Sequence, residues 1–340
     1  MIKKPDLNII TFAGIHGYSL AINQLILGLI DLGYKVKRIF YNGSNNIKRY
    51  DKETLADKTI LSINPIFMKQ YHKVGKTFVY TMFETEKIVP DIVKMINYFD
   101  GVIVPCKHNV HSFIKSGVNK PIKRVYLCVD PTFFTGDKIQ HKKFVFISHG
   151  SHSMRKGTDL MIKAFLEEFK KEKDVRLILK DSSSVIQDYK LPVHDTRIKR
   201  VVGRIPLLKL KKLLLSSDCG LFPSRGEGWG LGAMECMATG LPVILTNYGG
   251  LADMCDVKYN YPLNVEKLVS SKPYYIRFSK IYKDVGMWAE PDLNHLKKLM
   301  RHVYENRKEG IEKGQLASRW IKDNFNRKNQ AKKIAKIMKL

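Results

Sequence analysis

The sequence of 340 residues contains few cysteines and no cysteine pair with the spacing of a metal site or a redox motif. The five cysteines are Cys106, Cys128, Cys219, Cys236 and Cys255. None of them stands in a Cys-x-x-Cys pair, and the histidines do not complete a set of metal ligands. We therefore expect neither a zinc site nor a disulfide scaffold, and free thiols suit a reducing compartment.

Long apolar segments are also missing. No apolar run reaches the roughly 18 residues that a membrane-spanning helix needs. The first residues include two lysines, but the apolar segment 7–13 that follows is too short for the core of a signal peptide and lacks a cleavage pattern. We therefore expect a soluble, cytoplasmic protein, which could still contact the inner face of a membrane through its charge.

Acidic residues are scarce. The chain has 32 Asp and Glu against 59 Lys and Arg, a net charge of +27, and residues 291–340 alone carry 14 basic and 5 acidic residues. Such a field concentrates polyanions, which include nucleic acid, an anionic membrane face and an acidic glycan. A lysine-rich proteome with merely solvated surfaces is the other interpretation, and composition leaves both open.

The residues that are present have the composition of a globular protein, with 44% hydrophobic and 27% charged residues. Apolar strand-like runs alternate with amphipathic helical segments, which predicts an α/β protein with parallel sheets. Predicted strands cover residues 7–13, 35–41, 77–82, 101–104, 124–128, 144–148, 175–180, 219–222 and 242–245. Predicted helices cover residues 18–32, 90–98, 107–116, 158–170, 207–216 and 230–239, and a helical tail covers 291–340.

The chain is long enough for two domains with separate cores. A polar segment with Pro and Gly, residues 129–143, is the predicted interdomain linker. This gives an N-terminal domain of residues 1–140, a C-terminal domain of residues 141–320 and a basic C-terminal helix of residues 321–340. Both domains are predicted to be doubly wound, so ligands would bind outside the carboxyl ends of their strands.

The most informative stretch is residues 223–245, where Glu227 and Glu235 stand eight positions apart. Glycines stand around the first glutamate, at Gly226, Gly228, Gly230 and Gly232. The pattern predicts a strand, a glycine-rich turn that holds Glu227, a short helix that holds Glu235, and another strand. Glycines let a ligand approach the backbone, and a helix N-terminus favours an anion. Carboxylates accept hydrogen bonds from sugar and ribose hydroxyls.

Together with residues 218–225 and 240–244, this stretch resembles the E-x7-E signature of the retaining glycosyltransferases of family 4, which have the GT-B fold. The resemblance implies two Rossmann-like domains that face a central cleft, with the last helix packed back on the N-terminal domain. It implies a UDP- or GDP-linked sugar as donor, with no metal and no other cofactor. Glu227 would contact the donor sugar and Glu235 the ribose, while amides of Gly230, Leu231 and Gly232 would face the diphosphate.

The loop of residues 149–157 places Arg155 and Lys156 just before a predicted helix. Two fixed cations there could neutralise a departing diphosphate without a metal. A merely solvated basic helix N-terminus is electrostatically unfavourable, which favours the functional interpretation. In the family an upstream Arg and the Lys of a Lys-Gly pair do this. Lys156 matches the Lys, but Gly150 or Ser151 replaces the Arg, and Arg155 is the nearest substitute.

Two loops of the N-terminal half resemble loops of the same family. Gly14 and Gly17, between the first strand and the first helix, resemble the glycine-rich loop that closes on the donor diphosphate and the acceptor. A tight turn without a binding role would show the same glycine pattern. Glu84 follows a strand in a segment that resembles an acceptor-side loop, although a salt-bridged loop carboxylate is an equal interpretation. Cys106 stands where the family has Ser in a Val-Pro-Ser turn.

One segment of the C-terminal half completes the predicted donor site. Arg204 and Ile205 lie where the backbone of family members reads the nucleobase. The sequence does not indicate which base the donor carries.

The resemblance, taken with the net charge, implies an enzyme that moves a hexose from a nucleotide-sugar to an anionic acceptor with retention at the anomeric carbon. A cell-envelope glycan or lipid-linked saccharide is one acceptor, and DNA with hydroxymethylated bases, as modified by bacteriophage-type enzymes, is the alternative. A second alternative is an inactive protein that binds nucleotide-sugar or polyanion. The intact pair of Glu227 and Glu235 argues against this last interpretation.

Overall fold

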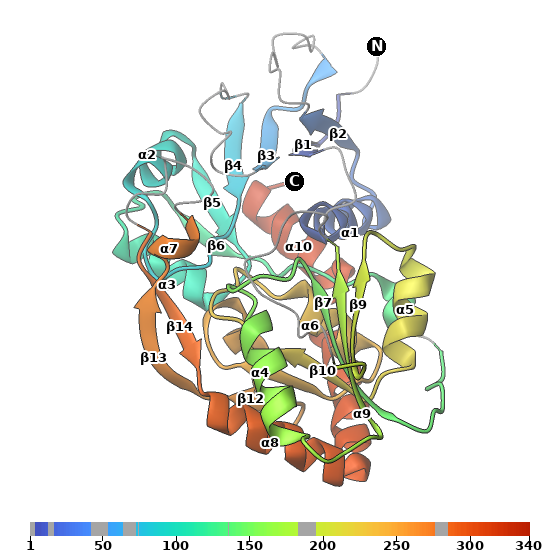
Figure 1. Ribbon diagram of the computed structural model, residues 1–340. Helices are drawn as coiled ribbons and strands as arrows, with labels where there is room; N and C mark the ends of the chain where they lie inside the picture. Colours follow the sequence, from blue (N-terminus) through green and yellow to red (C-terminus); the bar gives the residue numbers. More distant parts are fainter. Residues whose placement is uncertain are drawn as a thin grey trace. The chain divides into compact units, whose positions relative to one another are not determined.

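The computed structural model describes residues 4–12, 17–41, 54–63, 73, 75–134, 136–182, 195–275 and 285–340. The chain forms two compact units, and each unit draws on more than one stretch of sequence (Figure 1). Unit 1 comprises Met1–Asp130, Phe278–Gly286 and Asn324–Leu340, and unit 2 comprises Pro131–Arg277 and Met287–Asp323. Each unit contains its own six-stranded parallel sheet, so the prediction of two Rossmann-like α/β domains is confirmed.

Unit 1 is built on a parallel sheet with the order β2-β1-β3-β4-β5-β6. Its strands are β1 (Leu7–Phe12), β2 (Val36–Tyr41), β3 (Lys58–Ser62), β4 (Lys76–Tyr80), β5 (Gly101–Val104) and β6 (Ile122–Arg124). Its helices are α1 (Gly17–Asp31), α2 (Pro90–Tyr98), α3 (Lys107–Lys115) and α10 (Arg327–Met338). The strand order reverses at β1, which is the mark of a doubly wound sheet.

The last helix, α10, belongs to unit 1 and lies along α1, as the red and dark blue helices in Figure 1 show. The two helices can approach closely because Gly28 of α1 has no side chain. A Cβ atom at this position would lie 2.6 Å from the backbone oxygen of Arg327. Arg327 also forms an ion pair with Asp31 at 2.8 Å. The N-terminus of α10 is capped by Asn326, whose side chain accepts a hydrogen bond from the Asn329 amide at 2.9 Å.

Unit 2 is built on a second parallel sheet, with the order β12-β11-β10-β7-β8-β9. Its parallel strands are β7 (Phe144–Gly150), β8 (Val175–Asp181), β9 (Ile198–Val202), β10 (Cys219–Phe222), β11 (Val243–Thr246) and β12 (Tyr261–Leu263), and β13 (Val265–Ser270) pairs with β14 (Met287–Pro291) as an antiparallel hairpin. Its helices are α4 (Thr158–Glu168), α5 (Leu207–Leu215), α6 (Leu231–Ala238), α7 (Lys272–Tyr275), α8 (Leu293–Glu305) and α9 (Arg307–Asn324), with the 3-10 helices η4 (Pro131–Phe134) and η5 (Gly249–Met254). Counted within the unit, the strand order is third, second, first, fourth, fifth, sixth, which is the order of dinucleotide-binding sheets.

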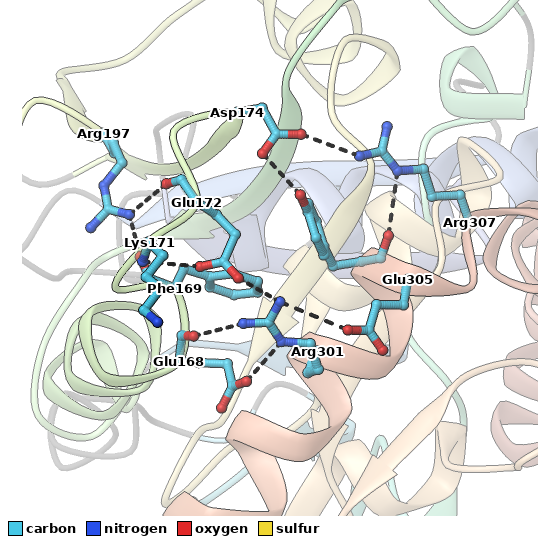
Figure 2. Close-up of polar contacts among 10 residues, drawn as sticks. Glu168, Phe169, Lys171, Glu172, Asp174, Arg197, Arg301, Glu305 and Arg307 are labelled. Atoms are coloured by element: carbon cyan, nitrogen blue, oxygen red, sulfur yellow. Dashed lines mark hydrogen bonds and ion pairs between the residues drawn. The ribbon is translucent and has the colours of Figure 1, made fainter.

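A cluster of charges attaches α8 to α4 and to the start of β8 (Figure 2). Arg301 of α8 donates to the Glu168 carboxylate at 2.8 Å and to the Glu172 carboxylate at 2.7 Å. Its guanidinium lies over the ring of Phe169, 4.8 Å from the ring centre. Phe169 belongs to the buried apolar core that α4 and α8 share with the sheet. The cluster lies where strand β8 begins, so it stabilises the edge of the sheet opposite to the carboxyl ends.

The predicted linker is wrong in its extent. The units divide between Asp130 and Pro131 rather than after residue 140, and the residues that follow belong to unit 2. The Ile139 amide donates to the Leu215 carbonyl at 2.9 Å, and Lys138 pairs with Asp218 at 3.5 Å. This polar segment is therefore attached to the end of α5 and to Asp218, just before β10, and its composition did not show this.

The predicted strand at residues 124–128 is misplaced, because β6 ends at Arg124. Beyond it, the Tyr126 amide donates to the side chain of Gln330 at 3.2 Å instead of joining a ladder. The sequence also missed β3, β9, β12, β13 and β14. Across the described part of the chain, no helix has the length and apolar character that a membrane span requires.

Candidate active site

The predicted donor site lies at the carboxyl edge of the unit 2 sheet, where the strand order changes direction. β7 and β10 are neighbours in this sheet, and the chain continues from them into the loops 151–157 and 223–230. Doubly wound sheets bind ligands at this switch point, because the loops that follow the two strands diverge there. The first loop carries Arg155 and Lys156, and the second carries Glu227. The structure thus brings these three predicted site residues together.

Glu227 is the centre of this site and is 8% exposed. Lys156 Nζ donates a hydrogen bond to its Oε1, and Ser224 Oγ donates to the same oxygen at 3.3 Å. Arg155 Nη1 lies 3.5 Å from Oε2 and donates to the Gly226 carbonyl at 2.6 Å. Burial raises the pKa of Glu227, but Lys156 and Arg155 outweigh it, so the pKa is lowered. The carboxylate is therefore ionised at neutral pH.

The two loops are packed against each other through a glycine. Gly157, which caps the N-terminus of α4, has φ of +67°, and a side chain there would lie 1.9 Å from the backbone oxygen of Pro223. Lys156 and Arg155 are thereby fixed beside the loop that carries Glu227. Lys156 and Arg155 together carry one positive charge more than Glu227 balances, which suits an anionic ligand beside these three side chains.

Glu235 lies in the middle of α6, whose N-cap residue Gly230 has φ of +105° and contributes no side-chain cap. His149, at the end of β7, contacts the same helix: its Nε2 lies 3.0 Å from the Gly232 carbonyl and 3.4 Å from Glu235 Oε2. Burial lowers the pKa of His149 to about 3, so the ring is neutral and Nε2–H donates to these oxygens. His149 thus holds Glu235, the residue predicted to bind the ribose. Leu231 is the first residue of α6, and no side chain caps the N-terminus of this helix.

Arg225 anchors the Glu227 loop and was not singled out from the sequence. All five N–H groups of its guanidinium are used. Two donate to Asp159 at 2.8 Å each, two to Glu290 at 2.6 and 2.7 Å, and one to the Met154 carbonyl at 2.5 Å. The Arg225 carbonyl accepts from the Ala289 amide at 2.8 Å. One buried guanidinium therefore ties the loop to α4 and β14.

A glycine pair supports the same loop from η5. The Gly250 amide donates to the Glu227 carbonyl at 2.7 Å. A side chain on Gly250 would lie 2.4 Å from the Trp229 amide nitrogen, and Gly249 has φ of +63°. Larger residues would push this loop away, so the position of Glu227 depends on backbone contacts that its own motif does not reveal.

The remaining predicted site residues belong to other segments of the chain. Arg204 and Ile205 follow β9 in unit 2, next to Gly203, whose carbonyl accepts from Lys180 Nζ at 2.5 Å. Glu84 lies in unit 1, in the half-buried loop after β4. Gly17 is the first residue of α1, whereas Gly14 lies outside the described residues.

Cys106 replaces the expected hydroxyl in a structural role. It is the N-cap residue of α3, and its Sγ accepts from the Asn109 amide at 3.4 Å. In the described ranges we find no group of three or more His, Cys, Asp or Glu side chains arranged to hold a metal ion.

Comparisons with known proteins agree with this architecture. Residues 130–260 match the family "Glycosyl transferases group 1", and residues 207–331 match "Family 4 Glycosyltransferase in conflict systems". The chain is 24% identical over 291 residues to an uncharacterized glycosyltransferase of Methanocaldococcus jannaschii, over 83% of this chain and 67% of that protein. It is 23% identical over 331 residues to the provisionally named glycosyltransferase 45 of Sulfolobus islandicus filamentous virus, over 92% of this chain and 88% of that one.

The fold is that of Anabaena HepE, whose crystal structure contains UDP-glucose. The TM-score is 0.71 at 13% sequence identity, over 98% of this chain and 99% of HepE. The two parallel sheets have the GT-B fold, and the family matches and the glycosyltransferase relatives support a glycosyltransferase of family 4.

Proposed function

We propose that this glycosyltransferase transfers a hexose from a UDP- or GDP-linked donor to an anionic acceptor, with retention at the anomeric carbon and without a metal ion. The observation that carries the proposal is the contact of Glu227 with Lys156 and Arg155 at the switch point of the unit 2 sheet. In a nucleotide-sugar the anomeric carbon is bonded directly to the diphosphate. A site for a nucleotide-sugar must therefore place a side chain that accepts hydrogen bonds from the sugar hydroxyls beside cations that bind the phosphates. Glu227, Lys156 and Arg155 have that arrangement.

In the proposed reaction, the bond between the anomeric carbon and the phosphate oxygen breaks, and the acceptor oxygen bonds to the same face of the sugar. The acceptor proton passes to the departing phosphate oxygen, so no side chain has to act as a base. Lys156 and Arg155 would stabilise the charge that develops on the diphosphate. Glu227, held ionised, would accept hydrogen bonds from the sugar and favour the positive charge that builds on it.

Glu235 and the N-terminus of α6 would hold the nucleotide. The first-turn amides of α6 have no side-chain cap and suit phosphate oxygens, while Glu235 would accept hydrogen bonds from the ribose hydroxyls. UDP-glucose in the crystal structure of HepE supports a nucleotide-sugar donor for this chain. A contact of Glu84 with the acceptor, and one of Arg204 and Ile205 with the nucleobase, remain part of the proposal.

Charge on unit 1 supports an anionic acceptor. Three of the residues that line a depression of about 400 Å³ are exposed lysines; the lining residues are Leu32, Tyr34, Lys332, Ala335, Lys336, Lys339 and Leu340. The depression lies where α1 ends and before β2 begins, so it is at the edge of the sheet opposite to the carboxyl ends of the strands. A cationic surface there would contact a long anionic acceptor, such as an envelope glycan or a lipid-linked saccharide at a membrane.

DNA with hydroxymethylated bases is the second candidate acceptor. The match to a family described by its place in conflict systems and the relative from a virus favour it. The net charge of +27 suits a DNA backbone as well as it suits an acidic glycan.

The test incubates the purified protein with labelled UDP- and GDP-sugars and with two acceptors, hydroxymethylcytosine DNA and a bacterial lipid extract. Label in lipid alone supports the first candidate, and label in DNA supports the second. Glu227→Ala should mainly lower turnover, and Glu235→Ala should mainly weaken nucleotide binding. Absence of both transfer and donor hydrolysis, with nucleotide binding intact, would indicate an inactive binding protein and refute the proposal.

A further inference from the structure

One buried lysine beside the predicted donor site takes no part in the proposed chemistry. Lys180, the penultimate residue of β8, is 4% exposed. Its Nζ donates to the Gly203 carbonyl at 2.5 Å and to the Asp181 carbonyl at 3.1 Å. Among the ion pairs of the described residues none involves Lys180. Two backbone oxygens therefore hold this ammonium group.

The position of Lys180 explains why it reaches this particular carbonyl. In the parallel pairing of β8 with β9, Lys180 stands opposite Val201. Gly203 lies two residues further on, just past the last residue of β9, and has φ of +90°. The lysine side chain thus spans from one strand to the first residue of the loop after the next strand. It fixes a carbonyl that the end of the ladder leaves without a strand partner.

The neighbouring residue holds the same strand from the other side of the sheet. Successive side chains of a strand point to opposite faces. Asp181 is fully buried and accepts from Arg200 of β9 at 3.0 Å. The His152 amide, from the loop after β7, lies 3.4 Å from the same carboxylate. Lys180 and Asp181 together therefore link the ends of β7, β8 and β9.

An apolar residue would fill this position in the sheet at a lower desolvation cost. Burial lowers the pKa of Lys180, with Asp181 acting in the opposite direction. A buried ammonium group whose hydrogen bonds go to backbone oxygens is costly for stability, so its presence here indicates that the position of the Gly203 carbonyl matters.

We infer that Lys180 is a positioning residue for the nucleobase: by holding Gly203, it sets the backbone of Arg204 and Ile205 that reads the base of the donor. This inference rests on the proposed function, in which that loop meets the nucleobase. It separates two parts of donor recognition. Lys180 would govern which base is bound, whereas Lys156 and Arg155 would govern the diphosphate.

The experiment measures binding of UDP, GDP and inorganic pyrophosphate by calorimetry, for the full chain and its variants. Lys180→Met removes the ammonium group, which donates the hydrogen bonds, while it keeps most of the length of the side chain. We expect it to weaken the preferred nucleotide about tenfold, the lower range for loss of a hydrogen bond from a charged group, and to reduce the UDP to GDP preference. Pyrophosphate binding should change by less than about twofold, because the diphosphate cations are untouched.

Three further variants separate positioning from a general loss of structure. Lys199→Met removes an exposed lysine of the adjacent strand and should leave all three affinities unchanged. Lys180→Arg keeps cationic donors and should restore part of the base preference. Gly203→Ala perturbs the same loop through backbone strain, because its added carbon meets no described atom within 4 Å beyond the adjacent residues, and it should also reduce the base preference.

Other results would overturn either this inference or the proposed function. Equal weakening of nucleotides and pyrophosphate, or a lower melting temperature with an unchanged base preference, would show that Lys180 is only structural and would overturn the inference. A wild-type protein that binds both nucleotides equally would overturn it too. A wild-type protein that binds neither nucleotide would refute the proposed function itself.

Discussion

The Arg225 network makes the sharpest stability prediction. In Arg225→Met the guanidinium is lost, and the carboxylates of Asp159 and Glu290 keep no cation of the network. The Arg225 side chain is 7% exposed, whereas Asp159 and Glu290 side chains are 28% and 20% exposed. Removing one partner of a buried charge network costs about 3–5 kcal/mol. Because both carboxylates can regain some water, we expect a loss of about 3 kcal/mol, the lower end of that range.

The assay is urea denaturation monitored by tryptophan fluorescence and circular dichroism, with glycosyl transfer measured on the same samples. Arg319→Met is the matched control, because Arg319 is exposed on α9. It should stay within about 0.5 kcal/mol of the wild type. Transfer by Arg225→Met should fall even at temperatures where the variant is folded, because the loop that carries Glu227 loses its attachment to α4 and β14.

Two results would refute this reasoning. A loss below about 1 kcal/mol would mean that the network contributes no more than one ordinary hydrogen bond. A large loss of stability with unchanged turnover in the folded variant would mean that Arg225 holds the domain together without positioning Glu227.

The other predictions concern the same edge of the sheet. Gly157→Ala forces a left-handed residue and a contact of 1.9 Å with a backbone oxygen, so it should cost more than about 2 kcal/mol. Gly150→Ala is strained too, at φ of +139°, but its added carbon meets no described atom within 4 Å, so it should cost less; a thermal melt distinguishes them. The pKa of His149 falls from 6.5 to about 3 on folding, so the unfolded chain binds more protons between these values, and stability is lost as the pH falls below 6.5. His149→Gln should remove up to about 1.4 kcal/mol per pH unit from that slope, measured by urea denaturation at pH 4–7; an unchanged slope would contradict a neutral buried ring. The pKa of Glu227 is lowered from 4.5 in the folded state, so its pairing stabilises above pH 4.5 and is lost as the pH falls through the folded value; the deficit of Lys156→Met, about 1–2 kcal/mol at pH 7, should shrink below pH 4.5, and a constant deficit would contradict the pairing.

The sequence predicted the residues whose function depends on local spacing. Glu227 and Glu235 could be found because glycines and apolar strands surround them within about twenty positions, and Lys156 because it precedes a glycine at a helix start. Strand β9 was missed because its sequence, Ile198–Val202, holds two basic residues among only five, which suits an edge strand exposed on one side. The hairpin of β13 and β14 was missed because its strands are separated by a long stretch of chain.

The residues that hold the site could not be predicted because their partners are distant in sequence. Arg225 meets Asp159 and Glu290, 66 and 65 positions away. Lys180 meets Gly203, and the sequence between them shows no pattern that would pair them. A charged residue in a sequence is usually solvated, and only the packed structure shows that these two are buried.

The buried charged residues are concentrated at the carboxyl edge of the unit 2 sheet, where the proposed donor site lies. Lys180, Asp181, Arg225 and Glu227 are the Lys, Arg, Asp and Glu residues that are buried in the part of the chain described by the structure. All four belong to unit 2, two at the end of β8 and two in the loop after β10. Charges of this kind cost desolvation energy, and a fold that needed only stability would replace them with apolar residues. Their concentration at one edge of one sheet fits the proposed donor site, where fixed charges would act on a ligand without rearrangement.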